Sequence, residues 1–490
     1  MNDSPNPPRT VDGSPTETPG RELRPSTDRG TSDPVVVQVQ QAASVIPLST
    51  QGPPRPAVPE ITFKPRRWLV LIPLALITTA SLLLHARLVE HHHIPPASAI
   101  IWGLSVTFIT IQIILAWFSR PYTAHPPSGH VTVVIPCYNE DREYLKRVLD
   151  SLRVQTRRPD AVIVCDDGSK VSYKGIPEEY PEVTWIRQDN AGKKHAQAAC
   201  IMADPTADFY VMIDSDSALE RKALKENLRP FADKRVMCSA GVEWASNFDR
   251  NILTRAIGAR SLAFQLFAMS SQSAARGNVL IAPGAFSIYR GSVIREALPA
   301  YLGETFAGEP VTLGDDTMLT LYALMRGRVV QQPTAVSFPA YPETVSHHLR
   351  QWLRWMRAGT IRQIWRLRYL PITSYGWWLS TWQMGSYTAG VAISVLLIVT
   401  WPHSLSLVLG SLIGLFMWPL ALGSRIACLS RSDQSVWSIL GGIALMPLAG
   451  LWYLLVLRQI RLYGIATCYK CGPGSWVTRQ KVEVRLHGHP

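Results

Sequence analysis

Two aspartates separated by one residue are the first candidates for chemistry in this chain. Asp214 and Asp216 directly follow residues 209–213, an apolar run rich in residues that favour β-strands. Such a run predicts a buried parallel strand, and open α/β sheets bind ligands beyond the carboxyl ends of their strands. Two carboxylates on one turn suit Mg²⁺ or Mn²⁺, which also takes phosphate oxygens from a substrate. Because Asp-x-Asp is also common in plain turns, the neighbouring segments must decide between the two interpretations.

Three other predicted strands also end in polar clusters. Residues 131–135, 161–165 and 183–187 are typical of short strands, and helical patterns at 141–155 and 191–202 lie between some of them. This alternation predicts a doubly wound α/β domain. Four polar clusters at one edge of a sheet predict a crevice for an anionic ligand, with carboxylates for a metal ion and lysines for phosphate. The residues concerned are Pro136, Tyr138 and Glu140 after the first strand, Asp166 and Asp167 after the second, and Lys193 and Lys194 after the third.

The positive charge of the chain lies beside apolar segments. The formal net charge is +13; residues 345–370 carry six Arg and no acid, and residues 457–490 carry six Lys or Arg and one Glu. Both stretches flank uncharged runs, so we expect the charge to lie at the surface of a lipid bilayer. This placement disfavours a nucleic-acid partner, which a basic protein would otherwise suggest.

Several uncharged runs are long enough to cross a bilayer. Residues 68–84 and 94–118 precede the α/β domain, and basic residues outside both runs place those ends in the cytoplasm. Residues 369–424 also lack charged side chains, which is enough for two spans, and residues 434–457 form a last run. The number of crossings stays open, because residues 434–466 could form a short hairpin or one run could lie in the interface. Seven scattered cysteines fit a reducing cytosol around the α/β domain.

These features divide the chain into six segments. Residues 1–64 are rich in Pro, Ser, Thr and Gly, which predicts a disordered tail. Two membrane helices within 65–120 precede the α/β domain at 130–344. In residues 345–370 apolar and Arg side chains recur at helical spacing on different faces, which predicts amphipathic helices in the membrane interface. Residues 371–466 are expected to form the C-terminal membrane helices, and residues 467–490 a cytosolic tail.

The polar clusters, in this order and between membrane spans, resemble the motifs of processive family 2 glycosyltransferases, the group of hyaluronan, chitin and cellulose synthases. The similarity covers about residues 65–482. It implies a GT-A-like domain in the cytosol, inserted between transmembrane helices of a multi-pass cell-membrane protein. The chain departs from the family pattern at Lys194, where Arg is usual, and at Val477, where Gly is usual. The segments that carry the resemblance are Asp166-Asp167-Gly168-Ser169, Gly192-Lys193-Lys194, Asp214-Ser215-Asp216, Gly314-Asp315-Asp316-Thr317, Gln351-x-x-Arg354-Trp355 and Trp476-Val477-Thr478-Arg479.

The resemblance implies transfer of a sugar from a UDP-sugar to the growing end of a β-linked polysaccharide, with inversion and export of the product across the bilayer. It gives Asp316 the role of general base, while Asp315 could orient that base or cap the following helix. Arg354 could alternatively face lipid phosphates. The implied site residues are Asp214 and Asp216 for Mg²⁺ or Mn²⁺; Pro136, Tyr138, Glu140, Asp166, Asp167, Lys193, Lys194, Asp214, Arg354, Trp476, Thr478 and Arg479 for the donor; and Gly284, Phe286, Gln351 and Trp355 for the acceptor.

Two other functions remain as alternatives. A membrane enzyme of the same family could add one sugar to a lipid acceptor and stop. An inactive export or scaffold subunit is the third possibility, and the intact acidic residues at 214, 216 and 316 argue against it. The sequence does not predict which UDP-sugar is used or whether two alternate, because Ala285-Phe286 departs from the family's usual acceptor segment.

Overall fold

The computed structural model describes residues 38–40, 58–65, 96–400, 419–420 and 422–472, with isolated helical positions at 75, 79, 83, 86, 87 and 90. Most of the expected N-terminal tail, most of the first expected span and residues 401–418 lie outside this part of the chain. So do three of the expected donor contacts, Trp476, Thr478 and Arg479.

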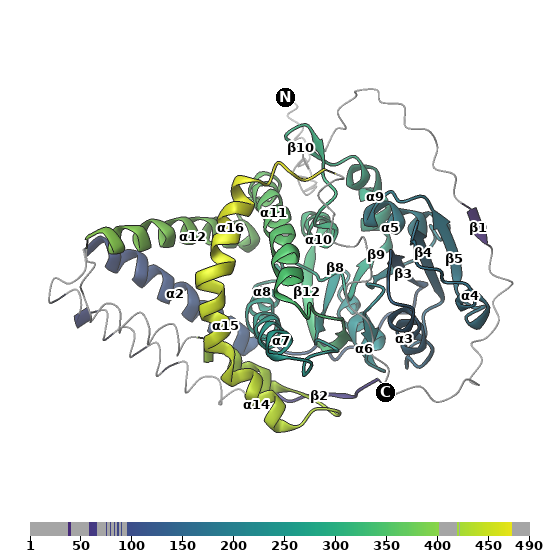
Figure 1. Cartoon of the computed structure of the whole chain (residues 1–490), viewed down its shortest axis with the longest axis horizontal. Coiled ribbons are helices and arrows are strands. Elements are labelled where there is room, and N and C mark those ends of the chain that lie inside the picture. The colour runs from purple at the N-terminus through teal and green to yellow at the C-terminus, as the bar shows by residue number, and fades with distance from the viewer. Residues whose placement is uncertain are drawn as a thin grey trace, which may run out of the picture. The chain divides into compact units, whose positions relative to one another are not determined.

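A mixed sheet forms the centre of the domain, and its nine strands within the described residues follow the order β1-β5-β4-β3-β6-β9-β8-β12-β7 (Figure 1). Strands β3, β4, β5 and β6 pair in parallel, which confirms the predicted parallel neighbours. Strand β9 pairs antiparallel with β6 and β8, so the sheet as a whole is mixed. The strands are β1 (Gln38–Gln40), β3 (Val131–Cys137), β4 (Ala161–Asp167), β5 (Thr184–Gln188), β6 (Phe209–Met212), β7 (Ala218–Leu219), β8 (Val236–Glu243), β9 (Ser287–Arg290) and β12 (Arg328–Phe338).

Helices cover both faces of the parallel strands, as a doubly wound domain requires. Successive strand residues point to opposite faces, so Val133 and Val134 belong to different hydrophobic clusters. Helices α5 (Lys193–Ala203), α9 (Gly291–Leu302) and α10 (Asp315–Arg326) pack into the cluster of Val134. Helices α3 (Arg142–Arg153), α4 (Ile176–Glu179) and α6 (Ala223–Leu228) pack into that of Val133.

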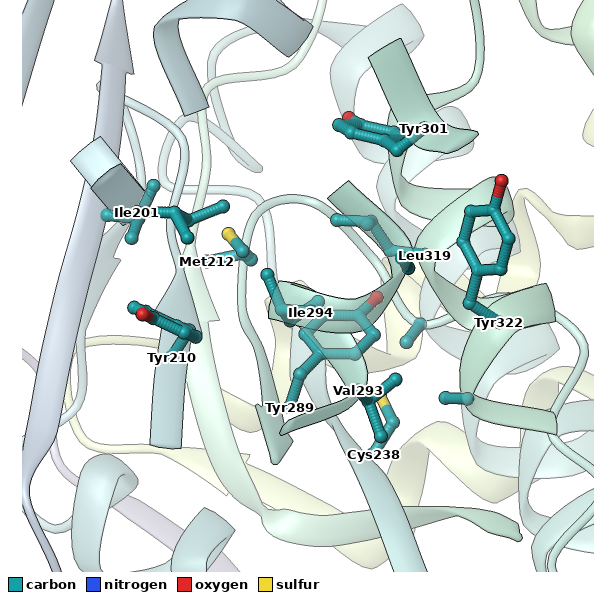
Figure 2. Close-up of a cluster of buried hydrophobic side chains, with 14 of the residues drawn as sticks. Ile201, Tyr210, Met212, Cys238, Tyr289, Val293, Ile294, Tyr301, Leu319 and Tyr322 are labelled. Carbon is teal, nitrogen blue, oxygen red and sulfur yellow. The ribbon is translucent and has the colours of Figure 1, made fainter. Parts of the chain in front are cut away.

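The Val134 cluster fills the space between the sheet and helices α5, α9 and α10. Figure 2 shows Tyr210 and Met212 of β6 together with Tyr289 of β9 and Tyr301 of α9 in this core. All four side chains are almost completely buried. Burial of a large side chain contributes roughly 1.5–3 kcal/mol to the stability of the fold. This core therefore holds helices α5, α9 and α10 against the sheet.

The described residues outside the sheet and the helices packed on it are mainly helical. Helices α7 (Ile252–Phe264) and α8 (Ser270–Ala274) join through a π-helical turn, η2 (Gln265–Met269), and α2 (Pro96–Phe118) contacts both α8 and η2. Helix α11 (Val345–Tyr369) contacts α16 (Arg458–Ala466), as Figure 1 also shows. Five shorter or separate elements are η1 (Arg229–Ala232), β10 (Thr305–Phe306), β11 (Glu309–Pro310), α12 (Tyr375–Thr400) and η3 (Ser424–Cys428).

One helix in the described part of the chain, Val436–Ala466, has the length and apolar composition of a membrane span. It comprises α14 (Val436–Ala444), α15 (Met446–Trp452), the π-helical turn η4 (Tyr453–Leu457) and α16. The alternative of a hairpin at 434–466 is therefore wrong. Pro447 does not reverse the chain because it lies in the first turn of α15, where proline is tolerated.

Part of the expected disordered tail is also structured. Strand β2 (Ile61–Phe63) pairs antiparallel with β13 (Leu429–Arg431), and β1 pairs antiparallel with β5. Residues 38–40 and 61–63 therefore correct the prediction for 1–64. Composition did not indicate these strands, because their backbone hydrogen bonds depend on partner strands that lie far away in the sequence.

Candidate active site

The polar loops after β3, β4, β5 and β6 meet at one edge of the sheet, as predicted. Hydrogen bonds hold them to one another. The Ser215 hydroxyl donates to Glu140 Oε2 at 2.9 Å, which joins the first loop to the fourth. The Asn139 amide donates to Ser169 Oγ at 2.8 Å, which joins the first loop to the second. Glu140 therefore supports the loop that carries Asp214 and Asp216.

The aspartates after β4 bind the loops of the protein itself. Asp167 is buried and accepts hydrogen bonds from the backbone amides of Ala191 at 2.9 Å and Gly192 at 2.8 Å. Asp166 accepts from the Ser169 amide at 2.9 Å and pairs with a guanidinium group of β5. Asp167 thus fixes the turn that begins α5, and Asp166 fixes the loop after β4 against β5.

Lys193, the first residue of α5, lies at the centre of the site. Its Nζ is 2.7 Å from Asp214 Oδ1 and 2.9 Å from Asp315 Oδ2. Burial alone would lower the pKa of Lys193, but the two carboxylates raise it above its ordinary value, so the side chain stays cationic. A Cβ atom at Gly284 would lie 3.1 Å from this Nζ, so the predicted acceptor segment also passes beside Lys193.

Asp315 and Asp316 occupy the first turn of α10 but have different surroundings. Gly314 precedes the helix with a left-handed backbone, φ 71°, so Asp315 is not the capping residue. Burial raises the pKa of Asp315, but the Lys193 charge lowers it below its ordinary value. Burial, followed by the negative charge of Asp315, raises the pKa of Asp316 to about 6. Asp316 is thus the carboxylate better suited to accept a proton near neutral pH.

Glu243, the last residue of β8, is a further carboxyl group near the aspartates of the site. Burial and then the charges of Asp214, Asp316 and Asp216, in that order, raise its pKa to about 8. The Tyr341 hydroxyl donates to Glu243 Oε2 at 3.4 Å. Since Lys193 contacts both Asp214 and Asp315, the aspartates after β6 and those that begin α10 share one site.

The two aspartates after β6 fit a divalent cation that takes further ligands from a substrate. Asp216 is buried and accepts a hydrogen bond from the Ser217 hydroxyl at 2.9 Å, whereas about a third of the Asp214 side chain is exposed. The described residues contain no group of three or more side chains of the usual ligand types. Mg²⁺ is commonly bound through one or two carboxylates plus substrate phosphates and water, and a pair of carboxylates meets that requirement.

Lys194 points into the protein and not toward the aspartates. Its Nζ pairs with Glu304 Oε2 and lies 4.9 Å from the centre of the Tyr301 ring. The same Glu304 oxygen pairs with Arg362 NH2 at 3.0 Å, and that nitrogen also donates to the Leu313 carbonyl at 2.9 Å. This buried triad, Lys194–Glu304–Arg362, joins the start of α5 to α11 and to the turn before Asp315.

The expected acceptor residues have different surroundings. Gly284 lies at the site, but Phe286 is completely buried and packs against Gly241 in the core. In α11, Trp355 keeps 46% of its surface exposed, whereas Gln351 and Arg354 are half-buried. Pro136 is buried within β3, which extends two residues beyond the predicted strand, and Tyr138 directly after β3 is half-buried.

The C-terminal segment that precedes Trp476 is anchored beside α10. The Thr312 amide and hydroxyl both donate to the Cys471 carbonyl, each at 3.0 Å. Thr312 lies two residues before Gly314, so Cys471 lies next to the turn that precedes α10.

Sequence reasoning did not identify Glu304, Arg362, Glu243 or Gln197 as parts of this site. One signal was available for Gln197, which lies four residues after Lys193 on the same helix face and donates to Asp315 Oδ2 at 3.2 Å. Arg362 was one of six arginines in a basic segment, and composition does not distinguish a buried guanidinium from a solvated one.

Comparisons with known proteins agree with these features. Residues 126–358 match the family described as "Glycosyltransferase like family 2". A hyaluronan synthase of Streptococcus pyogenes is 32% identical over 395 residues, which cover 77% of this chain and 90% of that protein. An N-acetylglucosaminyltransferase of Mesorhizobium japonicum is 32% identical over 272 residues, covering 52% of this chain and 63% of that protein. A mannosyltransferase of Pyrobaculum calidifontis, solved with GDP-mannose and Mn²⁺, aligns with a TM-score of 0.42 and 18% identity over 76% of this chain and 97% of that chain.

Proposed function

Because the chain belongs to glycosyltransferase family 2, we propose that it is a membrane-embedded synthase that polymerises a β-linked polysaccharide from UDP-sugars. The transfer inverts the anomeric carbon, and the enzyme moves the product across the bilayer. One observation supports this more than any other: Lys193 contacts both Asp214 and Asp315, which brings the predicted diphosphate site beside the predicted base.

The donor side of the site would stabilise the leaving UDP. Mg²⁺ or Mn²⁺ held by Asp214 and Asp216 would neutralise charge that develops on the diphosphate. Lys193 adds a fixed positive charge at the same place, already oriented by its two carboxylate contacts. Arg354, with Trp476, Thr478 and Arg479 of the tail, would contact the donor, and the anchoring of Cys471 beside Thr312 supports a tail that reaches the site.

On the acceptor side, Asp316 would act as the general base. As the acceptor hydroxyl oxygen bonds to the anomeric carbon, its proton passes to the Asp316 carboxylate and the bond to UDP breaks. A single displacement of this kind inverts the anomeric carbon. A positioned base contributes about 10²–10⁴-fold to such a rate. Trp355 would offer an exposed aromatic face to a sugar ring, and Gln351 and Gly284 would be further acceptor contacts.

A multi-pass arrangement in the cell membrane, with the α/β domain in the cytosol, completes the proposal. The apolar helix Val436–Ala466 and the uncharged 23-residue helix α2 support it. The names of the relatives favour N-acetylglucosamine as one transferred sugar, and the 90% coverage of the hyaluronan synthase favours polymer synthesis over single-sugar transfer.

Reconstitution tests this proposal. The purified chain in liposomes with Mg²⁺ or Mn²⁺ is given UDP-sugars singly and in pairs, and UDP release and product length are measured. We expect a long polymer when UDP-N-acetylglucosamine is present, alone or with one partner sugar. One sugar per acceptor would contradict polymerisation, and the absence of UDP release with every donor would contradict the catalytic function.

A further inference from the structure

A cavity lies where α2 ends, and none of the residues that line it belongs to the acidic site. Its volume is about 380 Å³, and its lining includes Phe118, Arg120, Tyr122, Ser273, Arg276 and Arg328. The described residues that line it include no Asp or Glu. We call this cavity the arginine pocket. A cavity with three guanidinium groups and no carboxylate in its lining favours an anion such as a phosphate ester.

The walls of the arginine pocket are held in place by the fold. The Tyr122 amide donates to Gln332 Oε1 and its carbonyl accepts from Gln332 Nε2, both at 2.9 Å. On the opposite wall, Arg276 (φ 60°) and Gly277 (φ 73°) both have left-handed backbones at the end of α8. The Gly277 carbonyl accepts from the Val329 amide at 2.9 Å, which fixes this turn against β12. These hydrogen bonds fix the backbone segments that carry Tyr122, Arg276 and Arg328 around the pocket.

Two of the three guanidinium groups are available for a ligand. Arg328 NH1 lies 3.2 Å from Asp233 Oδ2, so its charge is partly compensated. Arg120 and Arg276 are exposed, and within the described residues neither forms an ion pair with an acid. An anion in the pocket would thus meet at least two charges that the protein itself does not neutralise.

The position of the pocket indicates the source of the anion. Helix α2 has 23 residues and no charged side chain, and its last residue, Phe118, is 63% exposed at the mouth of the pocket. If α2 crosses the bilayer as proposed, the pocket opens at the headgroup level of the cytosolic leaflet, where basic pockets beside membrane helices bind anionic headgroups. A ligand here would place acyl chains along Phe118 and a phosphate among the arginines.

We propose that the arginine pocket binds the headgroup of an anionic phospholipid, with Arg120 and Arg276 as its main phosphate contacts. The inference rests on the proposed membrane position of α2 and not on sugar transfer. Failure of lipid binding would therefore leave the catalytic proposal intact, and loss of catalysis would leave this one intact.

Thermal unfolding of the full chain in dodecyl maltoside micelles tests the proposal. Phosphatidylglycerol, phosphatidylcholine or soluble glycerol 3-phosphate is titrated in, and tryptophan fluorescence reports the Tm. A ligand that binds only the folded state raises the Tm as its concentration increases. We expect phosphatidylglycerol to raise the Tm at lower concentration than phosphatidylcholine, and glycerol 3-phosphate to have little effect. Equal shifts from phosphatidylglycerol and glycerol 3-phosphate would contradict a lipid ligand.

Variants separate this pocket from a general effect of charge. Each basic contact near a membrane surface contributes about 1 kcal/mol, so the Arg120→Gln, Arg276→Gln double variant should weaken the apparent affinity for phosphatidylglycerol roughly thirtyfold. The matched control is Arg221→Gln, an exposed arginine outside the pocket, which should change it less than about twofold. The Arg120→Lys, Arg276→Lys double variant should retain most of the affinity for phosphatidylglycerol, because it keeps both positive charges. An unchanged affinity in the Gln variant, or an equal loss in the Arg221→Gln control, would overturn the proposal.

Discussion

At the scale of single residues, the adjacent carboxyl groups of Asp315 and Asp316 differ because their neighbours differ. Lys193 contacts both Asp214 and Asp315, and its positive charge outweighs burial and lowers the pKa of Asp315. Burial and the charge of Asp315 instead raise the pKa of Asp316 to about 6. A general base must be ionised to accept a proton. The protonation of Asp316 should therefore limit the rate on the acid side.

We predict that kcat/KM for sugar transfer falls as the pH decreases through about 6, and then by about tenfold for each further pH unit. The sign follows from the base role, since protonated Asp316 cannot accept the acceptor's proton. Initial rates between pH 5 and 8 at saturating acceptor test this, with donor affinity measured at each pH as a control. A rate that stays constant between pH 5 and 7 would argue against Asp316 as the base.

At the scale of elements, the Lys194–Glu304–Arg362 triad joins α5, α11 and the turn before α10. The Glu304 and Arg362 side chains are 3% and 0% exposed, so each charge depends on its partners for stabilisation. Removing one member of such a buried set leaves uncompensated charge, which typically costs 3–5 kcal/mol.

We predict that Glu304→Gln lowers the free energy of unfolding by about 3 kcal/mol, because Lys194 and Arg362 would then be buried without a carboxylate. Chemical or thermal denaturation in detergent measures this. The matched control is Glu296→Gln, which breaks a surface ion pair with Arg326. The Glu296 side chain is 60% exposed, so this change should lower the free energy of unfolding by less than about 1 kcal/mol. Equal losses in the two variants would show that the triad has no special structural role.

The parallel strands could be predicted because each has a local apolar pattern: β3 and β4 include all the residues expected, and β6 includes all but Ile213. The rest of the sheet could not be predicted, because β8, β9 and β12 pair through contacts between residues distant in the sequence. The same limit applies to the site. Asp214 and Asp316 have recognisable spacing, whereas Glu304 and Arg362 acquire their roles only when the segment after α9 meets α5 and α11 in the folded chain.

At the scale of the whole molecule, polymerisation requires that the acceptor stays bound between transfers. Trp355 is half-exposed on α11 and packs edge-on against the buried Trp352, with ring centres 6.2 Å apart. Trp352 donates to the Leu457 carbonyl at 3.1 Å, which connects this aromatic pair to the apolar helix Val436–Ala466. The acceptor face would thus adjoin the proposed membrane passage.

We predict that Trp355→Ala shortens the polysaccharide and raises the KM for an added oligosaccharide acceptor by roughly tenfold, since loss of one aromatic stacking contact costs about 0.5–1.5 kcal/mol in addition to buried area. Gel filtration of the product gives its length. Trp437→Ala, on the exposed face of α14 at 80% exposure, is the control and should leave both quantities unchanged. Products of normal length from Trp355→Ala would remove this residue from the acceptor path.

The most direct test of the account is the Asp316→Asn variant, purified and reconstituted with the donor that the parent enzyme uses. Donor affinity and single-turnover transfer are measured side by side. We predict that transfer falls by about 10²–10⁴-fold, because the base is lost, while the Kd for the donor changes little and the Tm does not decrease, because burial disfavours the charge that is removed. Transfer at the parent's rate in this variant would contradict the catalytic role of Asp316 and the mechanism proposed here.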